Sequence, residues 1–202
     1  MDELERRLRS TAPRGEAGPA TDDLAVRAAD RGLLDVAYAT ADSPLGPLLL
    51  ARTPRGLVRV AYLDPEPEDG VLDDLAARVS PRVLRAPRAL DDVRRELDRY
   101  FAGRQRAFGV PVDWRLTRGF TRRVLERTAA IGYGATATYR DVAAAAGSPA
   151  GSRAAGNALG ANPIPIVVPC HRVVRSGGAL GGYTGGAHRK ELLLRLEGVT
   201  AG

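Results

Sequence analysis

The sequence predicts an α+β protein: a small domain built on an antiparallel sheet, followed by a mostly helical domain that contains a helix-turn-helix. Three short apolar runs separated by turn residues occupy 33–63, whereas helical periodicity dominates after residue 119. The chain has 202 residues, of which 44% are hydrophobic and 27% charged. This is the balance of a soluble globular protein with one large or two small domains.

The first domain begins with three predicted strands. The runs are LLDVAYAT, GPLLLART and GLVRVAYL, and the segments ADSPL and TPRG separate them. This spacing favours an antiparallel meander. The segment DPEPEDG ends the pattern, and two helical stretches follow. In the second, 88–101, apolar side chains recur at helical spacing and predict one buried face: Leu90, Val93, Leu97, Tyr100 and Phe101.

Composition divides the chain into four parts. Residues 1–30 are charged and then rich in Pro, Gly and Ala, which indicates a flexible N-terminal extension. We expect an α/β domain over 31–110, a linker over 111–118 within an extended stretch, and a second domain over 119–202.

Two short helices are predicted in the second domain. Thr138 and Asp141 have the spacing of a capping box, which opens the helix YRDVAAAA. Ser148 and Pro149 have the chemistry of an N-cap and a first-turn proline for a helix over 149–159. Two short helices joined by a glycine-containing turn are typical of a helix-turn-helix.

The second of these helices, PAGSRAAGNAL, carries almost only small side chains around Arg153. It lacks the large polar side chains that read base edges in the major groove. A smooth surface suits close approach to a groove wall, and it equally suits a tightly packed core helix. The pattern leaves both interpretations open.

Charge is unevenly distributed along the chain. Residues 114–202 hold 12 basic and 4 acidic side chains, whereas residues 1–113 hold 18 basic and 20 acidic ones. A basic C-terminal half indicates a surface that binds a polyanion. The alternative is a general compositional bias toward arginine.

Several classes of protein are excluded by what the sequence lacks. The single cysteine cannot form an internal disulfide or a cysteine-based zinc site, and we expect no metal and no cofactor. No apolar stretch approaches the roughly 20 residues that span a bilayer, and the charged N-terminus is not a secretory signal. A cytoplasmic protein without membrane association is the expectation.

The segment PIPIVVPCHRVVRSGG places that cysteine next to one of only two histidines. A thiol reacts as the thiolate, so Cys170 needs a base such as His171, and the base needs an acid such as Glu197 or Glu191 to orient it. Adjacent strand residues point to opposite faces, so a direct contact would require a turn or a bridging water. The alternative is a small buried cysteine beside a surface histidine.

The same residues carry a family resemblance. IPIVVPCHRVV, preceded by RAAGNALGANP and followed by GGYTGG and LEG, resembles the O6-alkylguanine-DNA alkyltransferases. The match runs from about Phe120 to Gly198, and the N-terminal meander with LDRYFAGRQRAF is similar to that family's first domain. The resemblance implies an RNase H-like first domain and a winged helix-turn-helix second domain.

The resemblance also implies a function, the stoichiometric repair of alkylated DNA. The target nucleotide would leave the duplex, because its reacting atom is buried in the base stack. Cys170 would take the alkyl group from O6-alkylguanine, His171 would accept the thiol proton through a water, and Glu197 would orient the imidazole. Asn162 would brace the turn that carries the cysteine. The substrate would be double-stranded DNA bound by a monomer; O4-alkylthymine as a second lesion and cooperative binding along DNA are left open.

Further positions follow from the same resemblance. Tyr139 would press on the flanking phosphate and donate a proton to the leaving guanine, and Arg153 would fill the gap left by the extruded nucleotide. Other DNA contacts are expected from Ser152, Ala154, Arg122 and Arg123. The base pocket is expected to be formed by Tyr183, Thr184, Val173 and Pro165.

Three other functions compete with this one. A protein that flags damage without repairing it would be expected to lack the motif cysteine. A transcription regulator would need a more polar recognition helix. A cysteine protease would need signs of an oxyanion hole and a substrate cleft, which the sequence does not offer.

Overall fold

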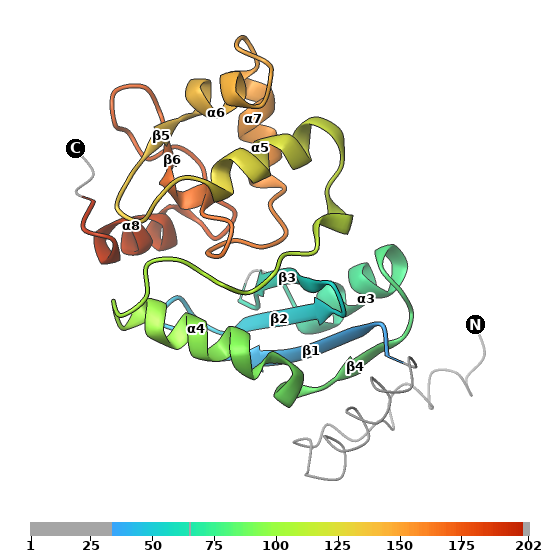
Figure 1. The fold of residues 1–202 in the computed structure, drawn as a ribbon. Coiled ribbons are helices and arrows are strands. Elements are labelled where there is room, and N and C mark those ends of the chain that lie inside the picture. The colour runs from blue at the N-terminus through green and yellow to red at the C-terminus, as the bar shows by residue number, and fades with distance from the viewer. Residues whose placement is uncertain (1–33, 65, 200–202) are drawn as a thin grey trace.

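The computed structural model describes residues 34–64 and 66–199 (Figure 1). The sheet and the helices before residue 102 form one lobe, and the helices after residue 118 form the other. This arrangement confirms the α+β fold class, with a small sheet domain followed by a helical one. The predicted flexible extension, residues 1–30, lies outside the described residues.

The predicted three-stranded meander is confirmed. Strands β1 (Val36–Ala41), β2 (Leu48–Thr53) and β3 (Gly56–Tyr62) pair antiparallel in sequence order. A fourth strand, β4 (Val83–Arg85), pairs parallel to β1 and completes the order β3-β2-β1-β4. Strand β4 was not predicted, because three residues are too few to show an alternating pattern.

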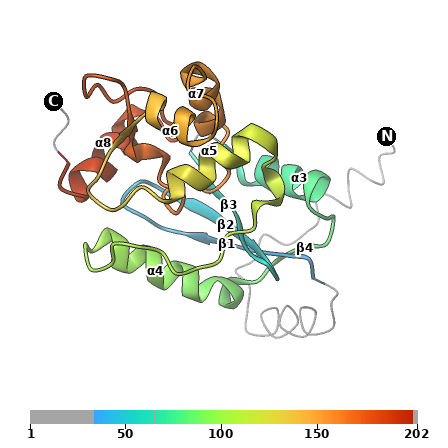
Figure 2. The same cartoon turned by 45° about the horizontal axis from the view of Figure 1, so that its top comes forward.

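The sheet is covered on both faces. Leu49 and Ala51 of β2 pack with α3 (Glu68–Arg78), whereas Leu48 and Leu50 face the core that contains α4 (Asp91–Phe101). Successive strand residues point to opposite faces, so a centrally placed β2 buries every one of these four side chains. Figure 2 shows α3 and α4 on either side of the strands.

The buried face predicted for 88–101 is also confirmed. The first residues form a short 3-10 helix, Pro87–Leu90, before α4 begins. Four of the five apolar side chains are fully buried and Phe101 is partly buried against the same cluster. The periodicity therefore identified the face correctly, although it did not distinguish the two helix types.

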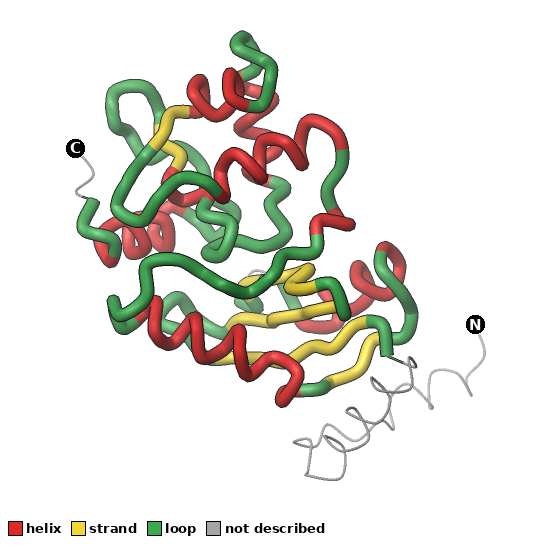
Figure 3. The backbone as a smooth tube through the Cα atoms, in the orientation of Figure 1, coloured by secondary structure: helices red, strands yellow, loops and turns green. Residues whose placement is uncertain are grey.

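The segment after α4 crosses between the two lobes mostly as loop (Figure 3). It lies along β3: the Leu57 amide donates to the carbonyl of Pro111 (2.8 Å), and the Asp113 amide donates to the carbonyl of Leu57 (2.8 Å). A Cβ added to Gly56, whose φ is +139°, would lie 2.3 Å from the Pro111 oxygen. Glycine is therefore required where the linker docks on the sheet.

The second lobe begins after a short 3-10 helix, Trp114–Leu116. It contains α5 (Gly119–Ala129), α6 (Tyr139–Ala145), α7 (Ser152–Gly160) and α8 (Ala187–Leu196). A parallel pair, β5 (Ala137–Thr138) and β6 (Val173–Val174), joins the start of α6 to the motif segment.

One of the two predicted helix starts is right and the other wrong. The capping box at Thr138 and Asp141 is present, with each side chain accepting from the other residue's amide. The second helix begins at Ser152 with Gly151 as N-cap, and not with Ser148. Ser148 starts a turn instead, since its carbonyl accepts from the Gly151 amide (2.8 Å). The chain needs this turn to reverse between α6 and α7, which delays the helix by three residues.

The two lobes share one hydrophobic core. Its members include Leu50 and Tyr100 of the first lobe and Leu125 and Ile164 of the second. The Val60 amide of β3 donates to the carbonyl of Pro163, close to the motif segment (2.8 Å). The sheet domain thus packs directly behind the segment that carries the cysteine. None of the helices described in 34–199 is long and apolar enough to cross a membrane.

Candidate active site

Asn162 holds the loop that leads to the cysteine. Its side-chain oxygen accepts from the Ile164 amide (3.0 Å), and its side-chain nitrogen donates to the Val168 carbonyl (2.9 Å) and to Cys170 Sγ (3.1 Å). Ile166 within this loop has φ +75°, a region that is strained for a β-branched residue. The Asn162 contacts fix this strained loop, and the thiol with it.

Cys170 is buried, with 4% of its surface exposed, at the start of a 3-10 helix spanning Cys170–Arg172. Burial raises the pKa of the Cys170 thiol to about 11, although the Asn162 hydrogen bond and the Lys190 cation act in the opposite direction. The thiol is therefore neutral at physiological pH. A reaction at sulfur needs a neighbouring base to take its proton.

His171 is the nearest candidate for that base and is fully buried. Its Nε2 lies 3.0 Å from Oε1 of Glu197, whereas its Nδ1 has no hydrogen-bond partner among the described residues. Burial lowers the pKa of His171, against the raising effect of Glu197, so the imidazole is neutral and able to accept a proton. The 3-10 turn keeps the two neighbours from pairing directly, since Cys170 bonds to Asn162 and His171 to Glu197.

Both carboxylate oxygens of Glu197 accept several hydrogen bonds. Arg172 donates to both carboxylate oxygens (2.8 and 2.9 Å), the Tyr100 hydroxyl donates to Oε1 (2.7 Å), and the Gly134 amide donates to Oε2 (3.2 Å). Burial alone would raise the pKa of Glu197, but the hydrogen bonds from His171, Arg172 and Tyr100 outweigh it and lower the pKa to about 2. The carboxylate is thus ionised at physiological pH.

The competing acid, Glu191, is not part of the cluster. It is exposed on α8 and pairs with Arg195 one turn later (2.8 Å). Two members of the cluster, Arg172 and Tyr100, were not predicted as site residues. Arg172 stands next to the Cys-His pair and could have been noticed there, whereas Tyr100 was recognised only as a core residue of its helix.

A pocket of about 430 Å³ opens above the cysteine. Its wall is formed by Cys170 together with residues at the start of α6, along α7 and in the loop before α8, including Tyr139, Arg153, Tyr183 and Thr184. The Tyr139 hydroxyl donates to the Gly182 carbonyl (3.3 Å), and burial raises its pKa. The Tyr183 hydroxyl is 2.8 Å from that of Tyr62 on β3.

Pro165 and the backbone near Val173 were also expected at the base pocket, and their role there stays a prediction. Pro165 and Val173 are buried and are not among the lining residues. The carbonyl of Val173 accepts a hydrogen bond from Lys190 Nζ.

Lys190 is the single lysine of the chain, every other basic side chain apart from the histidines being arginine. It is fully buried on α8, and its Nζ also donates to the Gly182 carbonyl (3.3 Å). Burial lowers the pKa of Lys190 to about 8.

Helix α7 has one side buried in the core and one side exposed, so the core packing is confirmed and the approach to a groove stays a prediction. Ala155, Ala158 and Leu159 are buried against the core, whereas Arg153 and Ala154 are exposed. Ser152, at the first position of the helix, lines the pocket together with Arg153. The small residues thus allow close packing on one side and a smooth accessible surface on the other.

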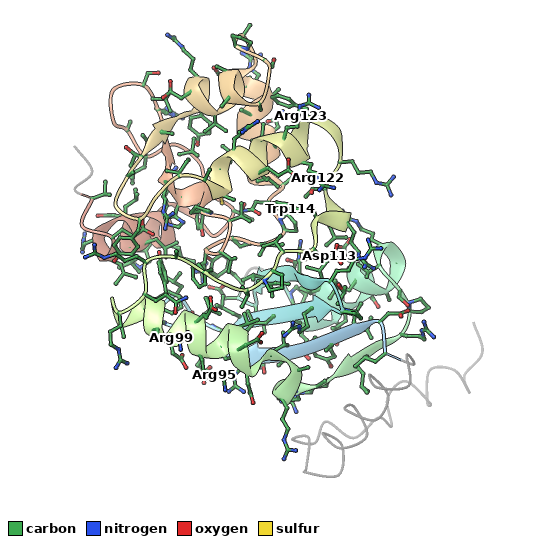
Figure 4. The ribbon with its side chains drawn as sticks, viewed as in Figure 1. Arg95, Arg99, Asp113, Trp114, Arg122 and Arg123 are labelled. Carbon is green, nitrogen blue, oxygen red and sulfur yellow. The ribbon has the colours of Figure 1, made fainter. Side chains whose placement is uncertain are left out.

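Arg122 and Arg123 are exposed on α5 (Figure 4). Arg122 pairs with Glu126 (2.8 Å), and Arg123 Nε donates to the carbonyl of Ala146 at the end of α6 (3.1 Å). Arg123 therefore ties α5 to the helix-turn-helix. Within the described residues, no group of three or more His, Cys, Asp or Glu side chains could hold a metal ion.

Comparison with known proteins agrees with this arrangement. The family model for the ribonuclease-like domain of 6-O-methylguanine DNA methyltransferase matches residues 36–114. The model for the DNA-binding domain of the same proteins matches residues 119–199. The chain belongs to the 6-O-methylguanine DNA methyltransferase family.

Relatives of this methyltransferase come from distant organisms. The methylated-DNA–protein-cysteine methyltransferase of Mycobacterium tuberculosis (strain ATCC 25618 / H37Rv) is 40% identical over 160 residues, which cover 79% of this chain and 91% of the relative. That of Mus musculus is 36% identical over 176 residues, covering 82% of each. The crystal structure of M. tuberculosis OGT in complex with DNA matches with a TM-score of 0.69 and 38% identity, covering 80% of this chain and 93% of that one.

Proposed function

We propose that this methyltransferase repairs DNA by transferring the alkyl group of O6-alkylguanine to Cys170 in a single, irreversible step. The observation that carries the proposal is the position of Cys170. Its buried thiol lies at the wall of the pocket, held by Asn162, with the His171–Glu197 pair beside it. The relatives named methylated-DNA–protein-cysteine methyltransferase support the same chemistry.

The reaction needs one proton to move. The thiol pKa of about 11 leaves sulfur protonated, and the unpartnered Nδ1 of His171 is the available acceptor, reached through a water. As the bond from sulfur to the alkyl carbon forms, the bond from that carbon to guanine O6 breaks. Tyr139 donates a proton to the leaving guanine and recovers one from the imidazolium through solvent. The thioether product does not hydrolyse, so each molecule acts once.

DNA would be held by α7 and the basic surface around it. The accessible side of α7 has small side chains that allow close approach to the minor groove, and Arg153 at its start lies at the pocket mouth. A base must leave the stack to reach the buried sulfur, and Arg153 would occupy its place. Ser152, Ala154, Arg122 and Arg123 would contact the backbone, where basic side chains bind without regard to sequence. In the predicted division into 31–110, 111–118 and 119–202, the last part would be the one that engages DNA.

Intact mass spectrometry after incubation with duplex DNA containing O6-methylguanine tests the central claim. We expect each molecule to gain one methylene unit, located at Cys170 by peptide mapping. Cys170→Ala should gain no mass and still bind the alkylated duplex. An unchanged mass for the unmodified protein, or a gain in the variant, would refute the assignment.

The role of Arg153 is tested separately. Arg153→Ala should slow the reaction with duplex DNA far more than the reaction with free O6-benzylguanine, because the free base needs no extrusion. Equal losses on both substrates would show that Arg153 does not act in extrusion.

A further inference from the structure

One side chain of the sheet domain reaches the proton-accepting cluster. Tyr100 lies in the last turn of α4, is fully buried, and donates its hydroxyl proton to Oε1 of Glu197 (2.7 Å). The same oxygen lies 3.0 Å from Nε2 of His171. The two residues of the hydrogen bond are 97 positions apart in the sequence, so the contact exists only because the two lobes are packed together.

The ring and the hydroxyl of Tyr100 have separate tasks. The ring packs among Phe101, Phe108 and Tyr133 with centroid distances of 5.4, 5.2 and 6.1 Å. Phenylalanine would fill that space equally well. A buried hydroxyl must be hydrogen-bonded to avoid a desolvation penalty, so its presence here reflects the carboxylate that it contacts.

We propose that Tyr100 is a positioning residue for the alkyl transfer. Through its hydroxyl, the sheet domain holds the Glu197 carboxylate in place and weakens the hydrogen bond that this carboxylate accepts from His171. The proposal rests on the proposed function, since it assigns a role to Tyr100 in the step that deprotonates Cys170.

Three side chains compete for one oxygen atom of Glu197. Oε1 of Glu197 interacts with Tyr100, His171 and Arg172, and each donor withdraws electron density from it. Without the Tyr100 hydroxyl, Oε1 becomes a stronger acceptor for the imidazole N–H. The pKa of His171 then rises toward that of an exposed histidine, because the Glu197 hydrogen bond is the contact that favours the protonated ring.

The remaining charged and titratable groups around the pair stay unchanged in this comparison. Arg172 and Lys190 both act to lower the pKa of His171, and the ring of Tyr183 lies 6.3 Å from the imidazole. Cys170 precedes His171 in the same turn and titrates far above neutrality. Removing the Tyr100 hydroxyl alone is therefore expected to change the pKa of His171.

The test is the pH dependence of the single-turnover reaction with free O6-benzylguanine, which avoids any effect on DNA binding. The rate falls at low pH when His171 is already protonated and cannot accept the thiol proton. Tyr100→Phe is compared with Tyr133→Phe. The Tyr133 hydroxyl belongs to the same aromatic group but donates to the Leu196 carbonyl (2.9 Å), one residue from Glu197.

For Tyr100→Phe we expect the acid limb of the profile to move up by about half a pH unit. A full charge-assisted hydrogen bond represents roughly one to two pKa units, and Glu197 retains its other donors. Tyr133→Phe should leave the limb in place. The titration of His171 followed by NMR, where only two histidines contribute signals, should move with the rate profile.

A ring-fluorinated tyrosine placed at position 100 gives a second variant that keeps the packing intact. Fluorination makes the hydroxyl a stronger donor, so the limb should move to lower pH, a direction that loosened packing would not produce. An acid limb at the original pH in both position-100 variants, or equal displacement in Tyr133→Phe, would overturn the proposal. Failure of the unmodified protein to take the methyl group from duplex DNA containing O6-methylguanine would instead refute the proposed function.

Discussion

Replacing Glu197 by glutamine tests how much the folded state depends on this carboxylate. Glutamine has nearly the same shape but no charge, so Arg172 would keep a buried cation without its counterion. The fall in the pKa of Glu197 from its ordinary 4.5 to about 2 corresponds to about 3 kcal/mol of folding free energy at pH 7. Its side chain is 0% exposed, so the carboxylate and Arg172 form a buried ion pair. Breaking a buried ion pair by removing one partner costs about 3–5 kcal/mol, which agrees.

The loss should depend on pH with a defined sign. The folded-state pKa lies below the unfolded one, so the stabilisation is complete above pH 4.5 and is lost as the pH falls toward 2. The difference between the two proteins should shrink to about 1 kcal/mol at pH 3. Urea unfolding monitored by the fluorescence of Trp114, the single tryptophan, measures it at both pH values. A difference below about 1 kcal/mol at pH 7, or one that is the same at pH 3, would contradict this reasoning.

Two further substitutions test the loop and the linker. Asn162→Ala removes the hydrogen bond to Cys170 Sγ, so the pKa of the thiol should rise further. The alkyl-transfer rate at pH 7, measured by single-turnover kinetics, should then fall about tenfold, and an unchanged rate would contradict this. Gly56→Ala forces a Cβ against the Pro111 carbonyl at a positive φ and should cost about 3 kcal/mol or more in thermal unfolding. Gly103→Ala, at φ +68° in the left-handed helical region and with nothing within 4 Å of the added Cβ, should cost only about 1 kcal/mol; equal losses in the two variants would contradict the larger penalty expected at Gly56.

The sequence predicted the features that depend on local periodicity. The meander, the buried face of 88–101 and the capping box at Thr138 all follow from residues close together in the chain, and the structure agrees with each. The error at Ser148 arose because N-cap chemistry also suits a turn, and only the path between α6 and α7 decides between them.

The predicted site was incomplete for a different reason. The motif placed Cys170 and His171 beside each other, and the need for an orienting acid left Glu197 and Glu191 as candidates. The resemblance favoured Glu197, which the structure brings within hydrogen-bond distance of the imidazole. Tyr100 and Tyr62 reach the site only through packing of the sheet domain against the second lobe. Contacts between residues so far apart in the sequence cannot be predicted from the spacing of residues within a motif. The roles of the DNA-facing residues, the monomeric state and the cytoplasmic location stay predictions.

The burial of Lys190 has a practical consequence for chemical labelling. Because it is the only lysine and its side chain is fully enclosed, the folded protein offers no ε-amine to acylating reagents. Unfolding exposes that amine, so the fraction of molecules labelled at Lys190 by a short pulse of reagent measures the fraction that is unfolded. Peptide mapping of Lys190 and of Cys170 on the same sample would then report stability and repair together, without an attached dye or a purification of the two forms.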